Sequence, residues 1–302
     1  MIENINSVHK SKNRTIAIIL LFITTILWGS TFIITKNMTQ KVPIFLFLGL
    51  RFLVALIGFI PFFYRLKEIN KKIVVFGIFA GLIYFLAIAF QTYGLQTTSA
   101  GKAGFITGLA SIMVPFLVWI FFKKPLDKKI WFAVCLSVIG MALLMLEGES
   151  GVIIGDILVL ICAFFWALFI ILNDKYVRLV DVYLYSIVQL IVITLLCILF
   201  SFLTKEYYEL SSTNVGFWLI IIYMGFIVTT LTFFFQNWSQ KYVESSKTAI
   251  IFTFEPVFAV LFASWILSNE VLSVQGWLGC GLIFLAILIT VIKIKIQFKK
   301  NN

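Results

Sequence analysis

A glutamate and a proline stand side by side within one long apolar run of the sequence. Glu255 and Pro256 lie about a third of the way along residues 248–267, which read as a membrane-spanning segment. A carboxylate in hydrocarbon costs roughly 2.5–3.5 kcal/mol on insertion scales, so its default interpretation is functional. Because proline has no N–H, it leaves a carbonyl of the preceding turn without its usual partner. The sequence therefore predicts a helix break at Pro256 beside a buried charge, with Glu255 as a candidate for substrate contact and proton coupling.

Arg51 is the second charge that lies deep within an apolar run. It is eight residues into residues 43–63, which corresponds to about 12 Å of helix, and Glu255 is about 10 Å into its own run. In a hydrocarbon core of about 30 Å both side chains reach the middle third and could approach each other. Two interpretations stay open: a structural ion pair, or groups that face a cavity and contact substrate or a proton.

An indole and two hydroxyls lie within one and a half turns of the first apolar run. Trp28 is followed by Ser30 and Thr31, and a second indole, Trp166, stands at a comparable place in the sixth run. Two indoles that face each other across a cavity could stack on an apolar or aromatic solute, or on a cation. The alternative is that the hydroxyls bond back to their own helix and the indoles pack in the bundle. These four residues are candidates for the lining of a substrate cavity.

The composition defines the class of protein that must position these groups. Hydrophobic residues make up 62% of the chain and charged residues 12%, against roughly a quarter charged in a soluble domain. The apolar residues form runs of about 20, long enough to cross the membrane as helices, whereas a β-barrel would show alternating segments of about ten residues. The sequence predicts an all-α, polytopic membrane protein.

The net charge of +11 comes from basic residues in short segments between the apolar runs. That pattern serves topology and contacts with anionic lipid headgroups, so the lipid bilayer is an expected partner and nucleic acid is not. The four cysteines all lie in apolar runs, and the single histidine, His9, is in the polar N-terminal segment. We expect free thiols, no metal site and no cofactor.

Ten apolar runs can be marked along the chain. They are residues 16–35, 43–63, 73–91, 103–122, 130–146, 153–172, 183–203, 216–235, 248–267 and 274–292. If the N-terminus is cytoplasmic, nineteen lysines and arginines fall on the cytoplasmic side and four on the other. The positive-inside rule then places both termini in the cytoplasm.

Weak internal similarity joins the two halves of the chain. The spacing between Arg51 and Gln189 equals that between Trp28 and Trp166, and Gln91 near the end of the third run has a counterpart in Gln236 near the end of the eighth. Gln189 is therefore a further cavity candidate. Because each half holds five helices, an odd number, the second half enters the membrane from the opposite side. Inverted repeats around a site near the midplane are a feature of secondary transporters.

Five segments carry a resemblance to a known family. They are Trp28-Gly29-Ser30-Thr31-Phe32, Leu50-Arg51-Phe52, Gly94-Leu95 through Ser99-Ala100-Gly101-Lys102-Ala103, Glu255-Pro256-Val257-Phe258-Ala259 and Asn269-Glu270-Val271-Leu272. With these, the chain resembles the EamA family of the drug/metabolite transporter superfamily over essentially its whole length. The resemblance implies ten helices around a central cavity and export of small metabolites, amino acids or drugs across a bacterial cell membrane. The predicted organisation is two five-helix EamA repeats, 16–146 and 153–292, between cytoplasmic tails at 1–15 and 293–302.

One departure from the repeat concerns the prolines. Pro115 falls a turn later than a strict copy of Pro256 would, so the fourth helix need not bend where the ninth does. In the same alignment Glu255 has no acidic counterpart, because Ala110 and Ser111 occupy the matching place. The glutamate is thus predicted to be an asymmetric feature of a pseudo-symmetric bundle.

The sequence favours a secondary transporter rather than an enzyme. It would export a small organic solute, such as an amino acid or a similar amphipathic metabolite, by alternating access, with proton coupling through Glu255 as an option. The expected partners are that solute and the bilayer, and the oligomeric state is left between a monomer and a weak homodimer. Two alternatives stay open: a flippase for lipids or lipid-linked sugars, and, with less support, an integral-membrane enzyme that acts on lipids.

Overall fold

The computed structural model describes residues 2–123, 128–145, 153–210, 213–267, 274–275, 277–279, 281–286 and 289. Within these ranges the chain is helical with short connections, and no strand occurs. The predicted basic tail 293–302 and the segment Asn269-Glu270-Val271-Leu272 lie outside the described residues. The tenth predicted run is described only in part.

The helices follow one another closely along the chain. In order they are α1 (Ile2–Gly29), α2 (Thr31–Thr39), α3 (Ile44–Gly58), η1 (Ile60–Glu68), α4 (Lys71–Leu95), α5 (Ala100–Gly108), α6 (Ala110–Phe122), α7 (Lys128–Met145), α8 (Ile154–Tyr176), α9 (Val182–Leu203), α10 (Val215–Ile222), η3 (Tyr223–Leu231), α11 (Thr232–Gln240), α12 (Ser245–Phe252) and α13 (Glu255–Leu267). Here η1 is a 3₁₀-helix and η3 a π-helix. The segment predicted as an N-terminal tail continues α1.

Seven helical stretches of the described chain are long and apolar enough to cross a membrane. The number rises to eight if α3 and η1, bent by 73° at Phe59, count as one span. The prediction of a polytopic all-α membrane protein is therefore confirmed. The total of ten spans stays a prediction, because the tenth run is represented only by a shorter apolar helix within Trp277–Ala286.

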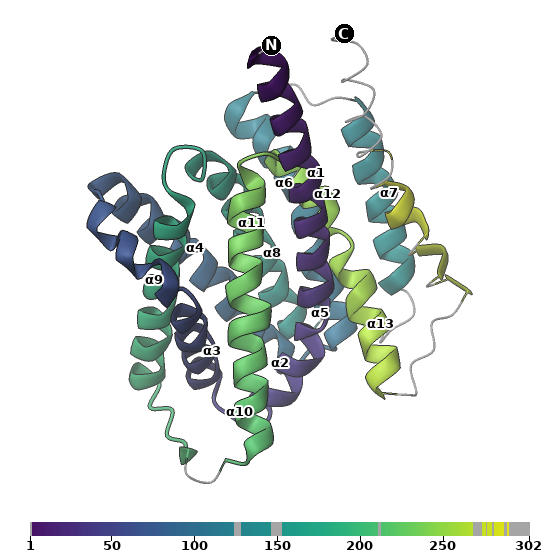
Figure 1. The fold of residues 1–302 in the computed structure, drawn as a ribbon. Coiled ribbons are helices and arrows are strands. Elements are labelled where there is room, and N and C mark those ends of the chain that lie inside the picture. The colour runs from purple at the N-terminus through teal and green to yellow at the C-terminus, as the bar shows by residue number, and fades with distance from the viewer. Residues whose placement is uncertain are drawn as a thin grey trace.

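The helices pack in a bundle with α8 near its centre (Figure 1). The α4 helix packs along α8 and α9, α3 packs along α9 and η3, and α1 lies against α11, α12 and α13. At one α4–α8 contact the backbones come close, since a Cβ added to Gly94 would lie 2.8 Å from the carbonyl oxygen of Gly155. Small residues permit such close approach in membranes, where apolar burial alone drives little helix association.

The polarity of the bundle suits a membrane, because polar groups gather inside it. Large apolar side chains such as Phe79, Leu195 and Leu219 are exposed on the outer surface, where lipid chains are as apolar as they are. Buried polar side chains instead include glutamines, asparagines, threonines and the two charges Arg51 and Glu255. Groups of this kind need partners inside the protein or must face a cavity.

Three spans are interrupted close to one another. The first breaks at Ser30 between α1 and α2, the fourth at Leu109 between α5 and α6, and the ninth at Thr253 and Phe254 between α12 and α13. The spacing that relates Gln91 to Gln236 also relates Leu109 to Phe254, so the fourth and ninth spans break at matching positions although their prolines do not align. Interrupted helices near the middle of a bundle are the places where transporters bind their solutes.

Candidate functional site

The three interruptions surround a pocket in the interior of the bundle. Its lining comes from α1, α5, α6, α8, α12 and α13, and consists of Trp28, Thr107, Gly108, Ala110, Ser111, Trp166, Ile170, Ala249, Phe252 and Glu255. The space between these residues, including the open mouth, is about 340 Å³. Helices from both halves of the sequence thus contribute to its walls.

Glu255 is placed in the pocket by the break of the ninth span. The α12 helix ends at Phe252, and α13 begins at Glu255 because Pro256 has no N–H to donate to the carbonyl of Phe252. In the first turn of α13 a carboxylate is stabilised by the helix dipole. Only 8% of the residue is exposed, and its carboxylate makes no hydrogen bond or ion pair within the part of the chain that the structure describes.

Arg51 is buried elsewhere and is held by a different partner. Its Nε donates a hydrogen bond of 2.8 Å to Oγ1 of Thr229, and its guanidinium carbon lies 5.5 Å from the ring centroid of Phe52. Thr229 in turn donates to the carbonyl of Met224, five residues earlier in the π-helix. No ion pair within 4.0 Å joins Arg51 to Glu255 in the described chain. The two predicted charges therefore occupy separate environments.

An aromatic layer lies beside the pocket. The ring of Trp28 is 5.5 Å from that of Trp166 and 5.0 Å from that of Phe252, and Tyr84 packs edge-on against Trp166 at 4.7 Å. Tyr84 is within electrostatic range of both Arg51 and Glu255. The two indoles predicted to face a cavity thus meet each other and form one aromatic wall.

The two indole N–H groups differ in their partners. Trp28 donates a hydrogen bond of 3.1 Å to Oγ1 of Thr232, whereas Nε1 of Trp166 is buried with no partner in the described chain. The sulfur of Cys162, on the same helix, is close enough to interact with this N–H, but sulfur is a weak acceptor. Trp166 therefore offers the pocket a ring edge and a donor that has no strong acceptor in the described chain.

Ser30 and Thr31 are near the pocket but do not line it. Ser30 bonds to the carbonyl of Leu27 at 2.7 Å and to the hydroxyl of Tyr223 at 3.0 Å. Thr31 donates to the carbonyl of Trp28 at 2.7 Å. Both hydroxyls satisfy the carbonyls that the break in the first span would leave unpaired, which is the structural alternative foreseen for them.

Gln189 belongs to a buried network of amides rather than to the pocket lining. Its Oε1 accepts from Nδ2 of Asn237 at 2.9 Å, and its Nε2 lies 3.4 Å from Oδ1 of Asn173. Asn173 also donates to Gln240 at 2.6 Å, and Gln240 donates to the carbonyl of Ile170 at 2.9 Å. Because Ile170 lines the pocket, this network joins the pocket wall to one end of α8.

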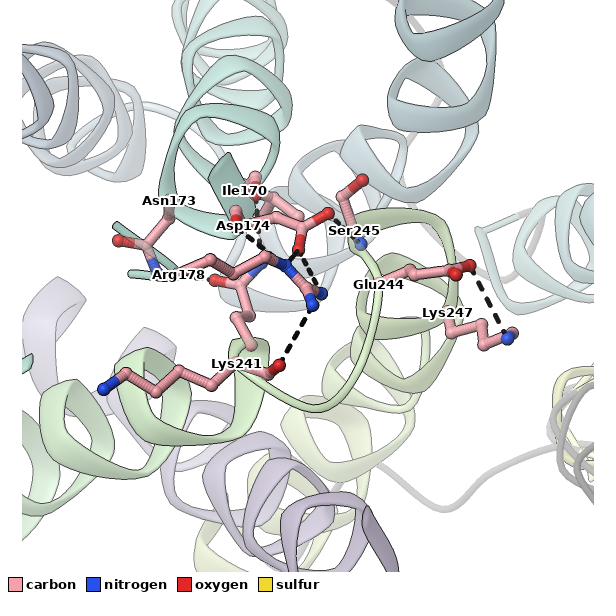
Figure 2. A network of polar contacts seen from close by, with 9 residues as sticks. Ile170, Asn173, Asp174, Arg178, Lys241, Glu244, Ser245 and Lys247 are labelled. Atoms are coloured by element: carbon pink, nitrogen blue, oxygen red, sulfur yellow. Dashed lines mark hydrogen bonds and ion pairs between the residues drawn. The ribbon is translucent and has the colours of Figure 1, made fainter. Parts of the chain in front are cut away.

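At that end of α8 the acid Asp174 connects three elements (Figure 2). Its Oδ1 accepts two hydrogen bonds from Arg178, of 2.9 and 2.7 Å, and its Oδ2 accepts one of 3.0 Å from the backbone N–H of Ser245 at the start of α12. Arg178 also donates to the carbonyl of Lys241, at 3.0 Å. These contacts, which we name the Asp174 cluster, tie α8 to the connection between α11 and α12.

The opposite end of α8 carries a comparable arrangement around Asp156. Lys102 pairs with its Oδ2 at 2.8 Å, Thr98 donates to its Oδ1 at 2.6 Å, and Lys36 reaches the carbonyl of Thr98 at 2.9 Å. This Asp156 cluster ties α8 to α2 and to the connection between α4 and α5. About 27 Å of helix separates the two acids, close to the thickness of a hydrocarbon core.

Neither cluster was foreseen in the sequence, and part of the pocket lining was missed as well. Thr107, Ser111 and Phe252 carry no local signal beyond their place in apolar runs, since only the breaks on either side bring them to the pocket. Within the described ranges no group of three or more His, Cys, Asp or Glu side chains could hold a metal ion.

The fold and this site define a multi-pass membrane transporter, and the comparisons with known proteins agree. The model of the EamA-like transporter family matches residues 15–146 and again 153–292, so the chain belongs to that family. An uncharacterized transporter from Archaeoglobus fulgidus is 34% identical over 91% of this chain and 85% of its own length. The uncharacterized transporter YoaV from Bacillus subtilis is 23% identical over 86% and 91%.

A solved structure supports the fold. A protein crystal structure at 17% sequence identity superposes with a TM-score of 0.74, over 91% of this chain and 96% of the other. At that identity the likeness concerns the arrangement of the helices. The pocket chemistry of this chain must be read from its own residues.

Proposed function

We propose that this protein is a secondary transporter that exports a small amphipathic solute, an amino acid or a similar metabolite, from a bacterial cell by alternating access. The observation that supports this best is the pocket itself, where three interrupted helices from both halves of the chain surround an unpaired carboxylate. In the proposed arrangement two inverted five-helix halves, 16–146 and 153–292, rock about this site. Both termini lie in the cytoplasm, as the distribution of basic residues favours.

The two clusters at the ends of α8 are suited to close the pathway in turn. When the Asp156 cluster holds α2 and α5 against α8, that side of the pocket is shut, and the Asp174 cluster does the same for α11 and α12. An exporter of this kind loads solute with the cytoplasmic cluster open and releases it with the other cluster open. The amide network at Gln189 links the pocket wall at Ile170 to the Asp174 cluster.

Glu255 gives the cycle a means of using a proton gradient. Its carboxylate faces the pocket and lacks a fixed counter-ion in the described chain, so it can bind either a solute group or a proton. If the two compete, inward movement of a proton is exchanged for outward movement of solute. The chain itself shows no nucleotide-binding motif of the Walker type, so an ion gradient is the energy source consistent with its sequence.

Flux measurements on the purified protein in proteoliposomes test this proposal. We expect radiolabelled amino acids or related amines to exchange across these vesicles faster than across protein-free vesicles, and a pH gradient to drive their accumulation. Glu255→Gln should abolish the effect of the pH gradient, whereas Glu68→Gln at an exposed position should not. Solute flux that never exceeds that of empty vesicles contradicts transport, and accumulation in Glu255→Gln that still follows the gradient contradicts the role of Glu255.

A further inference from the structure

The charge balance of the pocket restricts the solutes that can bind there. Glu255 is the one charged residue among the lining side chains that the structure describes. The titratable groups of neighbouring helices within electrostatic range of Glu255 are Tyr84 on α4 and Cys162 on α8. A phenol and a thiol are uncharged at neutral pH in their ordinary states. The pocket therefore carries a negative charge, or none when Glu255 is protonated.

A buried cation that could bind an anionic solute group is absent from this described lining. Arg51 donates to Thr229 at 2.8 Å and is not among the residues that line the pocket. Lys102 is paired with Asp156 at 2.8 Å at the far end of α8. A solute carboxylate placed in the pocket would thus lose its hydration without gaining a counter-ion, which is strongly unfavourable.

The remaining lining favours a cation with an apolar body. The rings of Trp28 and Phe252 pack against each other with centroids 5.0 Å apart, and the ring of Trp166 packs on Trp28 at 5.5 Å, so together they form an aromatic wall of the pocket. Aromatic faces attract ammonium groups, most strongly where water is excluded. The unpartnered Nε1 of Trp166 and the hydroxyls of Thr107 and Ser111 can serve neutral polar atoms of the same solute.

We propose that the pocket binds an amphipathic organic cation, with its ammonium group at Glu255 and its apolar or aromatic body against Trp28, Trp166 and Phe252. This inference rests on the proposed transport function and names its substrate class as amines rather than amino acids. An amino acid offers the same ammonium group but brings a carboxylate that the described lining does not neutralise. The pocket therefore ranks an amine above the amino acid of the same body, and the amino acid above the corresponding acid.

Binding of solutes that share one body but differ in charge tests this ranking. Phenethylamine, phenylalanine and 3-phenylpropionate form one series, and tryptamine, tryptophan and indole-3-propionate form a second. Dissociation constants of the full-length protein in detergent would be measured by isothermal titration calorimetry at pH 8. We expect the amine of at least one series to bind about tenfold more tightly than its amino acid, a difference of about 1.4 kcal/mol, and the acid to bind least.

Three variants show which residues produce the ranking. Glu255→Gln removes the charge with little change of size and should make the amine bind no more tightly than the amino acid. Trp166→Phe keeps a ring but removes the N–H donor, and should weaken the whole series while keeping its order. Glu68→Gln changes an exposed carboxylate that is 50% accessible and should leave every constant unchanged. Thermal unfolding of each variant shows that it is folded, and Glu255→Asp replaces Glu255→Gln if that variant is not.

Several results would overturn the inference. The first is that, in both series, the amino acid or the acid binds as tightly as the amine or more tightly. The second is that no amine binds at millimolar concentrations. The third is that the order of affinities is unchanged in the Glu255 variant. Flux measurements in vesicles distinguish failure of this binding inference from failure of the transport proposal. Amines that bind but do not cross the vesicle membrane refute transport and leave the binding inference in place, whereas flux of amino acids with exclusion of amines refutes the inference and leaves transport in place.

Discussion

Glu255 can attract a cation only while its carboxylate is ionised. As the pH falls and the residue takes up a proton, the charge that holds an ammonium group disappears, so cation binding should weaken toward acid pH. Tyr84 and Cys162, the titratable groups within electrostatic range of Glu255, are neutral in their ordinary states and do not supply the missing charge. The same protonation that releases solute is the step that would couple export to a proton gradient.

We predict that the affinity of the pocket for a cation depends on pH even when the charge of the cation itself does not. Benzyltrimethylammonium remains a cation at every pH, so calorimetric titrations from about pH 5 to 9 report the protein alone. Its affinity should rise with pH and then level off, whereas in Glu255→Gln it should be weak and flat. A profile that stays pH-dependent in Glu255→Gln would assign the titration to another residue.

At the scale of helices, Gly29 controls how closely the first and ninth spans approach. A Cβ at this position would lie 2.5 Å from Cβ of Phe258 and 2.9 Å from the backbone nitrogen of Ala259. Because α13 begins at Glu255, any displacement of α13 by a larger residue also moves the carboxylate. The glycine thus sets the geometry of the pocket without touching a solute.

Gly29→Ala should therefore lower stability and weaken amine binding together. Overpacking of a close contact costs about 1–3 kcal/mol, which should appear as a lower unfolding temperature in detergent. Gly101→Ala is the matched control, because a Cβ there meets nothing within 4 Å and alanine favours the helix. Unchanged stability and affinity in Gly29→Ala would show that α1 and α13 separate freely.

The two clusters on α8 make a second prediction at this scale, with Cys162 as a reporter. Cys162 is fully buried beside the pocket, so an impermeant maleimide should reach it only when one end of the bundle opens. With the other cysteines replaced by alanine, Asp156→Asn should increase labelling from one side of the membrane and Asp174→Asn from the other. Labelling of inside-out and right-side-out vesicles measures this, and equal labelling of both variants from one side would exclude separate closures.

Local sequence chemistry predicted some interruptions and not others. Pro256 indicated the break of the ninth span because its missing N–H acts on the turn just before it. Pro115 lies within α6, and the fourth span breaks instead at Leu109, six residues earlier and directly after Gly108. Glycine weakens a helix, but Gly104 lies inside α5, so a glycine alone does not mark the position of the break. The α6 helix also packs against α8 and α12, and contacts between distant segments leave no local pattern.

For the polar residues of the site, burial could be predicted from the sequence whereas hydrogen-bond partners could not. Burial of Glu255, Arg51 and Trp28 could be predicted, because charge or bulk within an apolar run must face the interior. Their hydrogen-bond partners could not be predicted, because Thr229, the acceptor for Arg51, lies 178 residues away in the sequence on a π-helical turn. Gln189 was expected in the cavity because the repeat relates it to Arg51, yet Asn173 and Asn237 from neighbouring helices occupy its hydrogen bonds.

At the scale of the whole molecule, the two halves of the chain contribute related positions to the pocket walls, but only one of these positions carries a charge. The spacing that relates the breaks at Leu109 and Phe254 also relates the next residues, Ala110 and Glu255, and both of these line the pocket. The first half thus presents a methyl group where the second half presents a carboxylate. If the halves are related by pseudo-symmetry about the pocket, a carboxylate at Ala110 faces the same space from the opposite wall.

Moving the carboxylate from one wall of the pocket to the other by mutation tests that relation. Glu255→Ala should lose amine binding, and the double variant Ala110→Glu with Glu255→Ala should recover it to within about tenfold of the wild type, a difference of about 1.4 kcal/mol. Ile112→Glu with Glu255→Ala is the control, because Ile112 points about 200° away from Ala110 around the helix and does not line the pocket, so this variant should recover less. Calorimetry gives the affinities and thermal unfolding shows that the variants are folded. A folded Ala110→Glu double variant that binds no better than Glu255→Ala would show that the starts of α6 and α13 do not present their side chains to the same part of the pocket.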